Sequence, residues 1–299
     1  MRFSVTFRVL FQIFLCLVPA FSGAAEEPFA TKESPVFSSK KPILDPAFSP
    51  DGKVLTFVAD DKGTNQIIIF NLEKKTTRTV TTDKLEKRSP AFTGDGKFIV
   101  YCGKKSGNFD IFKVAVEGGA SVPLTKTPED EFAVESSWNL FDDPEKEGAK
   151  PDEKFYRVFY LKGKNGAGEL FSMQDSGKFP RKELGGAYRS LSLGAEMQDI
   201  LLTDDRGVLL SRYAVGDSNW VSIGTPDAPV LATGSKGLSD AAFCNNSYHM
   251  FARKGQETVL FDRYTTKNEA LSPTFSTRVA ASRTMMRARP AIRFVPFTC

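Results

Sequence analysis

Few residues in the chain have the type and spacing that catalysis requires. A serine hydrolase needs a nucleophile in a Gly-x-Ser-x-Gly turn together with a histidine base, and no such turn occurs in the sequence. The single histidine, His249, precedes the apolar run 250–252, a pattern that is typical of a strand residue. One histidine also excludes zinc or iron sites built from several histidines. The sequence therefore predicts no catalytic residue and no cofactor.

Two Asp-Gly pairs, Asp51-Gly52 and Asp95-Gly96, resemble repeated metal ligands at first sight. Calcium needs several converging oxygen ligands, whereas each pair stands alone between two apolar runs. Glycine tolerates positive φ where a chain reverses, so an Asp-Gly pair at this place is the signal of a tight hairpin. We therefore assign Asp51, Gly52, Asp95 and Gly96 a structural role in turns, and we predict no metal site.

A positively charged residue recurs beside a glycine in five polar loops, each of which lies between two apolar runs. These residues are Lys62, Lys104, Lys105, Lys164, Arg206 and Lys254, and the glycines are Gly63, Gly107, Gly166, Gly207 and Gly255. Because Lys and Arg are common in the chain, chance placement is the competing explanation. If the loops gather at one end of the fold, they form a basic rim suited to an acidic peptide or protein. We predict that these six residues bind the partner.

An internal repeat indicates which elements position these loops. The segment 45–53 (DPAFSPDGK) returns 44 residues later as 89–97 (SPAFTGDGK). Each copy is followed by an alternating apolar run, a polar glycine loop, another apolar run and a short fourth strand that ends at 80–81 or 124–125, which is the pattern of four β-strands. Three weaker units repeat the strand, loop and strand pattern at 157–173, 200–210 and 250–261.

Four-stranded units of this length cannot bury both faces alone, but they cover one another when they stack radially. The sequence therefore predicts an all-β fold, a β-propeller of six four-stranded blades, with five blades as the alternative. The sixth blade would combine 272–299 with a strand near 35–37, so that strands from both termini close the ring. An acidic stretch near 141–154 interrupts the third unit and is interpreted as a surface insertion.

The motif at 46–53 resembles the repeat of TolB-like propellers, and the second copy departs from it at Thr93-Gly94. The resemblance covers about 41–125 and implies the propeller fold, which serves many functions. TolB-like proteins can carry a small α/β domain before the propeller. Only about 20 residues separate the expected export cleavage site from the first repeat, so we expect that domain to be missing.

The first 24 residues have the layout of a secretory signal peptide. Arg2 and Arg8 precede an almost entirely apolar stretch at 9–18, and small residues follow at 22–25. We expect cleavage after Ala24 or Ala25, a periplasmic location, and a single propeller domain over 25–299. An uncleaved membrane anchor is the alternative.

These features predict a non-catalytic exported propeller that binds a protein or peptide partner in the cell envelope, in a role that could be Tol-Pal-like. The alternative is a propeller enzyme, a lyase or hydrolase, which uses carboxylates and arginines that face the channel. The balance of 40 basic and 36 acidic residues is too even to indicate nucleic-acid binding. Membrane contact is expected only through the arginines from Arg278 to Arg293, and we expect a monomeric ring.

Overall fold

The computed structural model describes residues 34–37, 42–141, 155–194, 199–212, 229–243, 249–255, 257–262, 268–270 and 292–294. The chain divides into two compact units, Met1–Lys32 and Glu33–Cys299, and all described residues belong to the second. The expected signal peptide, the acidic segment 142–154 and the arginines at 278–289 lie outside the described residues. Within the described residues, no helix is long and apolar enough to cross a membrane.

The described residues of the second unit form five four-stranded sheets and one two-stranded sheet. The first sheet holds β2 (Ile43–Phe48), β3 (Val54–Asp61), β4 (Thr64–Asn71) and β5 (Thr76–Thr79), and the second holds β6 (Glu86–Phe92), β7 (Phe98–Lys105), β8 (Asn108–Ala115) and β9 (Val122–Pro123). The third holds β10 (Asp130–Phe141), β11 (Phe155–Lys164), β12 (Ala167–Gln174) and β13 (Arg181–Tyr188). The fourth holds β14 (Ser190–Leu193), β15 (Asp199–Asp204), β16 (Gly207–Arg212) and β17 (Val230–Lys236), and the fifth holds β18 (Ser239–Phe243), β19 (His249–Lys254), β20 (Glu257–Asp262) and β21 (Asn268–Ala270).

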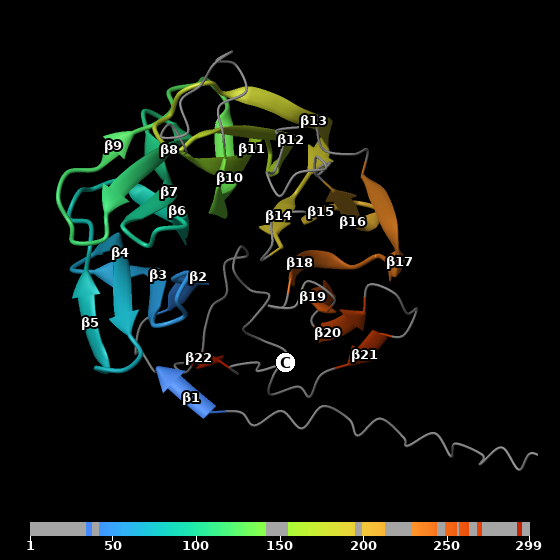
Figure 1. Cartoon of the computed structure of the whole chain (residues 1–299), viewed down its shortest axis with the longest axis horizontal. Helices are drawn as coiled ribbons and strands as arrows, with labels where there is room; N and C mark the ends of the chain where they lie inside the picture. Colours follow the sequence, from blue (N-terminus) through green and yellow to red (C-terminus); the bar gives the residue numbers. More distant parts are fainter. Residues whose placement is uncertain are drawn as a thin grey trace, which may run out of the picture. The chain divides into compact units, whose positions relative to one another are not determined.

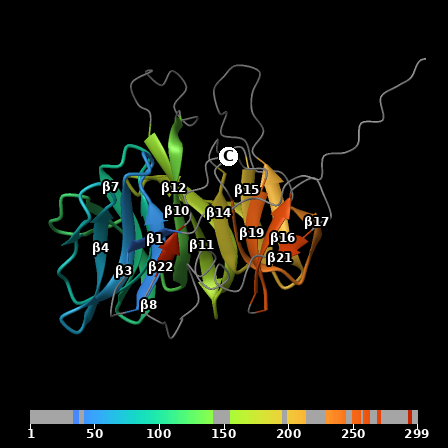
Figure 2. The same ribbon diagram turned by 90° about the horizontal axis from the view of Figure 1, so that it is seen from below.

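The strands of each four-stranded sheet are antiparallel and hydrogen-bonded in chain order, and the sheets follow one another around a central axis (Figure 1). The first strand of each sheet is innermost and contacts its neighbour, since β2 contacts β6, β6 contacts β10, β10 contacts β14 and β14 contacts β18. In the side view the strands run roughly along that axis (Figure 2). The chain is therefore an all-β β-propeller, as the repeat predicts.

The 44-residue repeat is visible in the backbone of the inner strands. β2, β6 and β10 each contain a bulge, at which Asp45, Ser89 and Ala133 have φ values of 49°, 48° and 58°. Pro46 and Pro90 lie directly after the first two of these residues, and a bulge is one place where a strand tolerates proline. The third sheet therefore keeps the geometry of the repeat although its sequence has lost the motif.

The apolar core lies between neighbouring sheets. The first two sheets share a cluster in which Val58 and Ile67 meet Tyr101 and Phe112, with the rings of Tyr101 and Phe112 stacked at 5.7 Å between centroids. Equivalent clusters join the second to the third sheet, the third to the fourth and the fourth to the fifth. Alternating side chains of β-branched and aromatic residues cover both faces of each sheet, which explains why these segments form strands.

The two-stranded sheet joins segments from opposite ends of the sequence. β1 (Ser34–Phe37) pairs antiparallel with β22 (Ile292–Phe294), with Ser34 opposite Phe294 and Pro35 opposite Arg293. The expected strand near 35–37 therefore pairs with a strand from 272–299. The remaining residues of that expected blade lie outside the described residues.

Candidate functional site

The hairpins that join the second and third strands carry the residues predicted to bind a partner. In the first three sheets each hairpin has a two-residue turn, Lys62-Gly63, Ser106-Gly107 or Asn165-Gly166, in which both residues have positive φ. A turn of this kind matches the twist of the paired strands, and glycine adopts its second position without steric cost. The loop glycines of the sequence therefore mark real hairpins.

All six predicted residues lie on these hairpins, and all six are exposed. Lys62 and Arg206 are in the turns, while Lys105, Lys164 and Lys254 are the last residues of β7, β11 and β19, and Lys104 precedes Lys105. In a four-stranded antiparallel sheet the second hairpin and the link to the next sheet lie at the same end. The structure therefore brings the six residues to one end of the propeller, which we call the basic end.

Several acidic side chains at the basic end are bonded within the fold. Asp61 accepts a hydrogen bond from the Thr79 hydroxyl at 3.1 Å. Asp83 pairs with the buried Lys87 ammonium at 2.7 Å, and Glu129 pairs with Lys162 at 3.7 Å. By contrast, none of four exposed lysines forms an ion pair with another described residue; they are Lys62, Lys105, Lys164 and Lys254. Within the described residues, these four lysines therefore present ammonium groups to solvent without a paired carboxylate.

Arg206 and Lys104 differ from those four lysines. The guanidinium of Arg206 lies 2.6 Å from the carboxylate of Asp204. Burial opposes ionisation of Asp204, but hydrogen bonds from Arg206 lower the pKa of this carboxyl. The ammonium of Lys104 lies 5.5 Å from the centre of the Phe109 ring, a cation–π distance. Arg206 is thus largely neutralised within its own hairpin, and Lys104 rests on an aromatic ring.

A cavity of about 430 Å³ opens beside the hairpin of the second sheet, a volume within the range of small ligand sites. Its lining includes the apolar Phe112, Pro123 and Leu124, and the ammonium-bearing Lys105 and Lys126. Sequence reasoning predicted Lys105 but missed the cavity and Lys126. The sequence signal for the cavity is the difference between the first two repeats, in which Lys105, Pro123 and Lys126 replace Asp61, Thr79 and Thr82.

Hydrogen bonds hold the walls of this cavity. The Asn108 side-chain amide donates to the Thr127 carbonyl at 2.7 Å, and the Thr127 amide donates to the Asp110 carboxylate at 2.9 Å. The Ile111 amide donates to the Thr125 hydroxyl at 2.8 Å. The segment after β9 is therefore fixed to β8 by side chains, although β9 itself has only two residues.

A buried carboxyl group lies next to this wall. Glu131 is 0% exposed, and its carboxyl group accepts hydrogen bonds from the hydroxyls of Thr125 and Thr127. Burial raises the pKa of Glu131 to about 7, with a further contribution from the nearby charge of Asp110, while Thr125 acts in the opposite direction. The repeat-related position in the second sheet is Lys87, whose ammonium donates to the Leu85 carbonyl at 2.8 Å.

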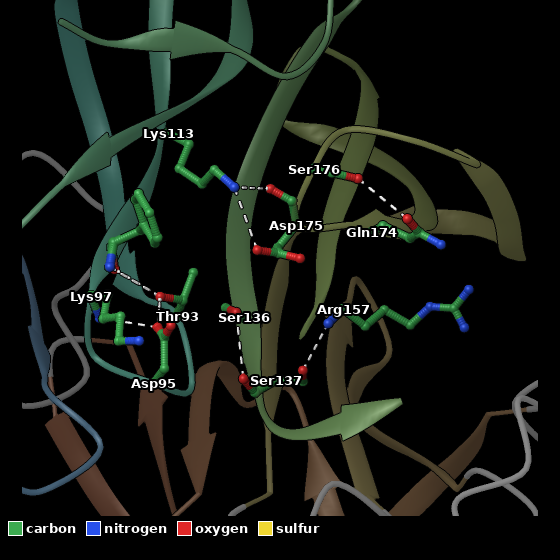
Figure 3. A network of polar contacts seen from close by, with 11 residues as sticks. Thr93, Asp95, Lys97, Lys113, Ser136, Ser137, Arg157, Gln174, Asp175 and Ser176 are labelled. Atoms are coloured by element: carbon green, nitrogen blue, oxygen red, sulfur yellow. Dashed lines mark hydrogen bonds and ion pairs between the residues drawn. The ribbon is translucent and has the colours of Figure 1, made fainter. Parts of the chain in front are cut away.

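The opposite end of the propeller carries the Asp-Gly turns. Asp51 Oδ1 accepts a hydrogen bond from the Ser49 hydroxyl at 2.6 Å, and this bond is the main reason why the pKa of Asp51 is lowered. Asp95 repeats the arrangement with Thr93 (Figure 3). Gly52 and Gly96 have φ values of 69° and 66°, as expected for residues that reverse the chain. The Asp-Gly pair lies in a turn between β2 and β3, as predicted, and the connection at 49–53 spans five residues.

Interactions at this end also tie neighbouring sheets together. The ammonium of Lys113, in β8, donates to the Asp175 carbonyl at 2.5 Å and lies 3.4 Å from its carboxylate (Figure 3). Asp175 belongs to the turn after β12, in the next sheet. Nowhere in the described ranges do three His, Cys, Asp or Glu side chains gather closely enough to hold a metal ion. The contacts at this end are those of a structural network.

The comparison with known families bears on residues 28–141, which match the model described as the TolB β-propeller domain. This segment consists of TolB-type β-propeller repeats. The TolB-like segment includes the first two sheets and β10, so it contains two of the basic hairpins. No curated protein sequence matches the chain.

Solved structures resemble the chain in fold. TolB from Acinetobacter baumannii is 19% identical with a TM-score of 0.53, and the match covers 75% of this chain but 52% of that one, so the chain spans about half the length of that TolB. A chain of a nidogen/laminin complex is 13% identical with a TM-score of 0.58, covering 80% of this chain and 82% of that one. A puromycin-hydrolyzing peptidase from Mycobacterium tuberculosis is 13% identical with a TM-score of 0.51, covering 77% and 37%. At such identities the likeness shows the fold alone.

Proposed function

We propose that this protein is a non-catalytic exported β-propeller that binds an acidic protein or peptide partner in the cell envelope. The observation that carries the proposal is the repeated exposed lysine at the basic end, where neighbouring acids are bonded within the fold. The TolB-type repeats at 28–141 motivate the choice of an envelope partner, in a Tol-Pal-like role. The nidogen/laminin match adds that a chain of this fold takes part in a complex between two proteins.

The charges of the basic end would mainly raise the rate at which the partner associates. Lysines on separate hairpins add their fields, which steers an acidic partner toward this end and speeds association. Such steering weakens as ionic strength rises, because the Debye length falls from about 10 Å at 0.1 M to about 3 Å at 1 M salt. Affinity beyond this steering would come from apolar contacts close to the hairpins.

The proposal includes a closed ring of six blades formed by 25–299 after removal of a signal peptide at 1–24. Two observations support closure by both termini. β1 pairs with β22, and Leu55, Phe57 and Phe70 are buried on the face of the first sheet that is turned away from the second. A blade built from both ends of the chain would cover that face.

The alternative function, a propeller lyase or hydrolase, needs carboxylates and arginines that converge on the channel. Buried acids with described contacts serve other purposes, since Glu131 bonds to threonines beside the cavity and Glu183 bonds to Arg181 and Ser172. Exposed lysines on hairpins suit binding better than acid–base catalysis, which requires groups within hydrogen-bond reach of a reacting atom.

The test is a charge reversal at the basic end with a matched reversal at the opposite end. The first variant combines Lys62→Glu, Lys105→Glu and Lys254→Glu. The control combines Lys53→Glu, Lys97→Glu and Lys178→Glu, three exposed lysines in loops between first and second or third and fourth strands. Both variants change the net charge equally.

Partner capture is measured by crosslinking and pull-down from an envelope fraction at low and high salt, and folding by circular dichroism. We expect the first variant to lose capture and its salt dependence while its unfolding transition stays in place, and the control to capture as the parent protein does. Capture by the first variant that equals the control at both salt concentrations would refute binding at the basic end.

A further inference from the structure

The first two sheets differ at a pair of repeat-related positions that, in the second sheet, line the cavity. In the first sheet, Asp61 at the end of β3 accepts a hydrogen bond from Thr79 in β5. Forty-four residues later these positions are Lys105 and Pro123. Proline has no donor and lysine has no acceptor, so the bond that joins the hairpin to the outer strand cannot form. Both residues instead line the cavity.

The same change alters the charge at the cavity. The carboxylate of the first sheet is replaced by the ammonium of Lys105, and Lys126 adds a second ammonium where the first sheet has Thr82. The lining also contains one carboxylate, Asp110, which accepts a hydrogen bond from the Thr127 amide and keeps its negative charge. The cavity therefore combines an apolar part, made by Phe112, Pro123 and Leu124, with two lysines that are exposed to solvent.

We propose that this cavity receives one apolar side chain of an acidic peptide segment, whose carboxylates meet Lys105 and Lys126. The proposal rests on the proposed function and specifies its partner as a segment in which an apolar residue is flanked by acidic ones. An apolar side chain matches the lining, and acidic neighbours match the two ammonium groups. Because hydrogen bonds already fix the walls, little ordering is needed on binding.

The experiment uses fluorescence anisotropy with three fluorescein-labelled peptides. One has a leucine flanked on each side by two glutamates, the second has serine in place of leucine, and the third has lysines in place of the glutamates. Burial of a leucine side chain is worth at least about 1.5 kcal/mol, which corresponds to roughly tenfold in affinity. We expect the parent protein to bind the leucine peptide about tenfold or more tightly than the serine peptide, and to bind the lysine peptide least.

Two variants separate the shape of the cavity from its charge. Lys105→Asp with Pro123→Thr restores the pair found in the first sheet and should close the cavity, so that the preference for leucine over serine disappears. Lys105→Gln removes one charge and leaves the cavity open, so both acidic peptides should weaken by a similar factor and the leucine preference should remain. Unfolding transitions of both variants establish that the fold is kept.

The outcomes distinguish this inference from the proposed function. Salt-sensitive binding of both acidic peptides without a leucine preference would overturn the cavity assignment and leave the basic end as the binding surface. A leucine preference that survives in the double variant would also overturn it, since the apolar side chain would then bind elsewhere. Binding that ignores peptide charge altogether would overturn both proposals.

Discussion

Glu131 offers a quantitative test of the structure, because its carboxyl group is fully buried beside the cavity wall. Replacing it by glutamine keeps the size of the side chain and removes its charge at every pH. Thr125 and Thr127 donate to different oxygens of the carboxyl group, so in the glutamine variant Thr125 can still donate to the amide oxygen while the Thr127 hydroxyl accepts a hydrogen bond from the amide NH2. The substitution therefore isolates the energetic consequence of ionising this one group inside the fold.

The sign of the effect follows from the two states of the chain. Burial raises the pKa of Glu131 from 4.5 to about 7 in the folded protein. Below about pH 4.5 both states hold the proton, so the group does not penalise folding. As the pH rises toward 7 the unfolded chain loses its proton while the folded chain keeps it, and stability falls through this window. At about 1.36 kcal/mol per pH unit, the loss is roughly 3 kcal/mol by neutral pH.

The measurement is urea unfolding, followed by circular dichroism, at several pH values from 4 to 8. We expect Glu131→Gln to gain stability relative to the parent protein by up to roughly 3 kcal/mol between pH 4 and pH 8. Glu117→Gln is the control for loss of a surface carboxyl, since the Glu117 side chain is 93% exposed. If the difference in free energy of unfolding between Glu131→Gln and the parent protein is the same at every pH in this range, ionisation of the buried carboxyl is not the cause of the difference.

Three further outcomes follow from the structure and the sequence. Gly52→Ala and Gly96→Ala should each lower the free energy of unfolding by about 1 kcal/mol without changing partner capture, because both residues have positive φ; urea unfolding and the pull-down check this. Deleting 272–299 should lower stability by several kcal/mol, because in the proposed six-bladed ring the last blade covers the buried apolar side chains of the first sheet, and a truncated chain that melts like the full chain would favour a ring of five blades. Intact mass of the exported protein should show a start at Ala25 or Glu26, and a start at Met1 would rule out the cleaved signal.

Sequence reasoning reached the propeller through features that depend on local chain chemistry. The loop glycines mark hairpins because a two-residue turn requires positive φ, and the alternating apolar runs mark strands because successive side chains point to opposite faces. The last part of each unit was less well predicted. The sequence pattern places the end of the first unit's fourth strand at Val80-Thr81, but β5 ends at Thr79. The Thr81 hydroxyl instead accepts a hydrogen bond from the Ile67 amide.

The environment of charged residues could not be predicted, because it depends on partners from distant segments. Lys87 and Glu131 occupy the same repeat position with opposite charge, and both are buried. Each is tolerated because the link between two sheets supplies groups of the matching kind, the Asp83 carboxylate and carbonyl oxygens for Lys87 and hydroxyls for Glu131. The ion pair between Arg206 and Asp204 could not be predicted either, because it depends on how the two side chains are oriented in the fold. Charge in a loop sequence therefore overstates the charge that reaches solvent.

The placement of the apolar clusters has a consequence for how this protein folds and evolves. Four of the described clusters take their side chains from two adjacent sheets, so these sheets share their cores and none of them is a domain in its own right. The remaining described cluster lies on the first sheet alone. In such an array the free energy of unfolding is largely a sum of terms from neighbouring sheets, and the smallest cooperative unit is a pair of sheets. A substitution in an interface between sheets must therefore fit the side chains of both sheets, whereas a substitution at a hairpin tip must fit one sheet only. Successive copies can diverge at their tips while the interfaces between them stay complementary.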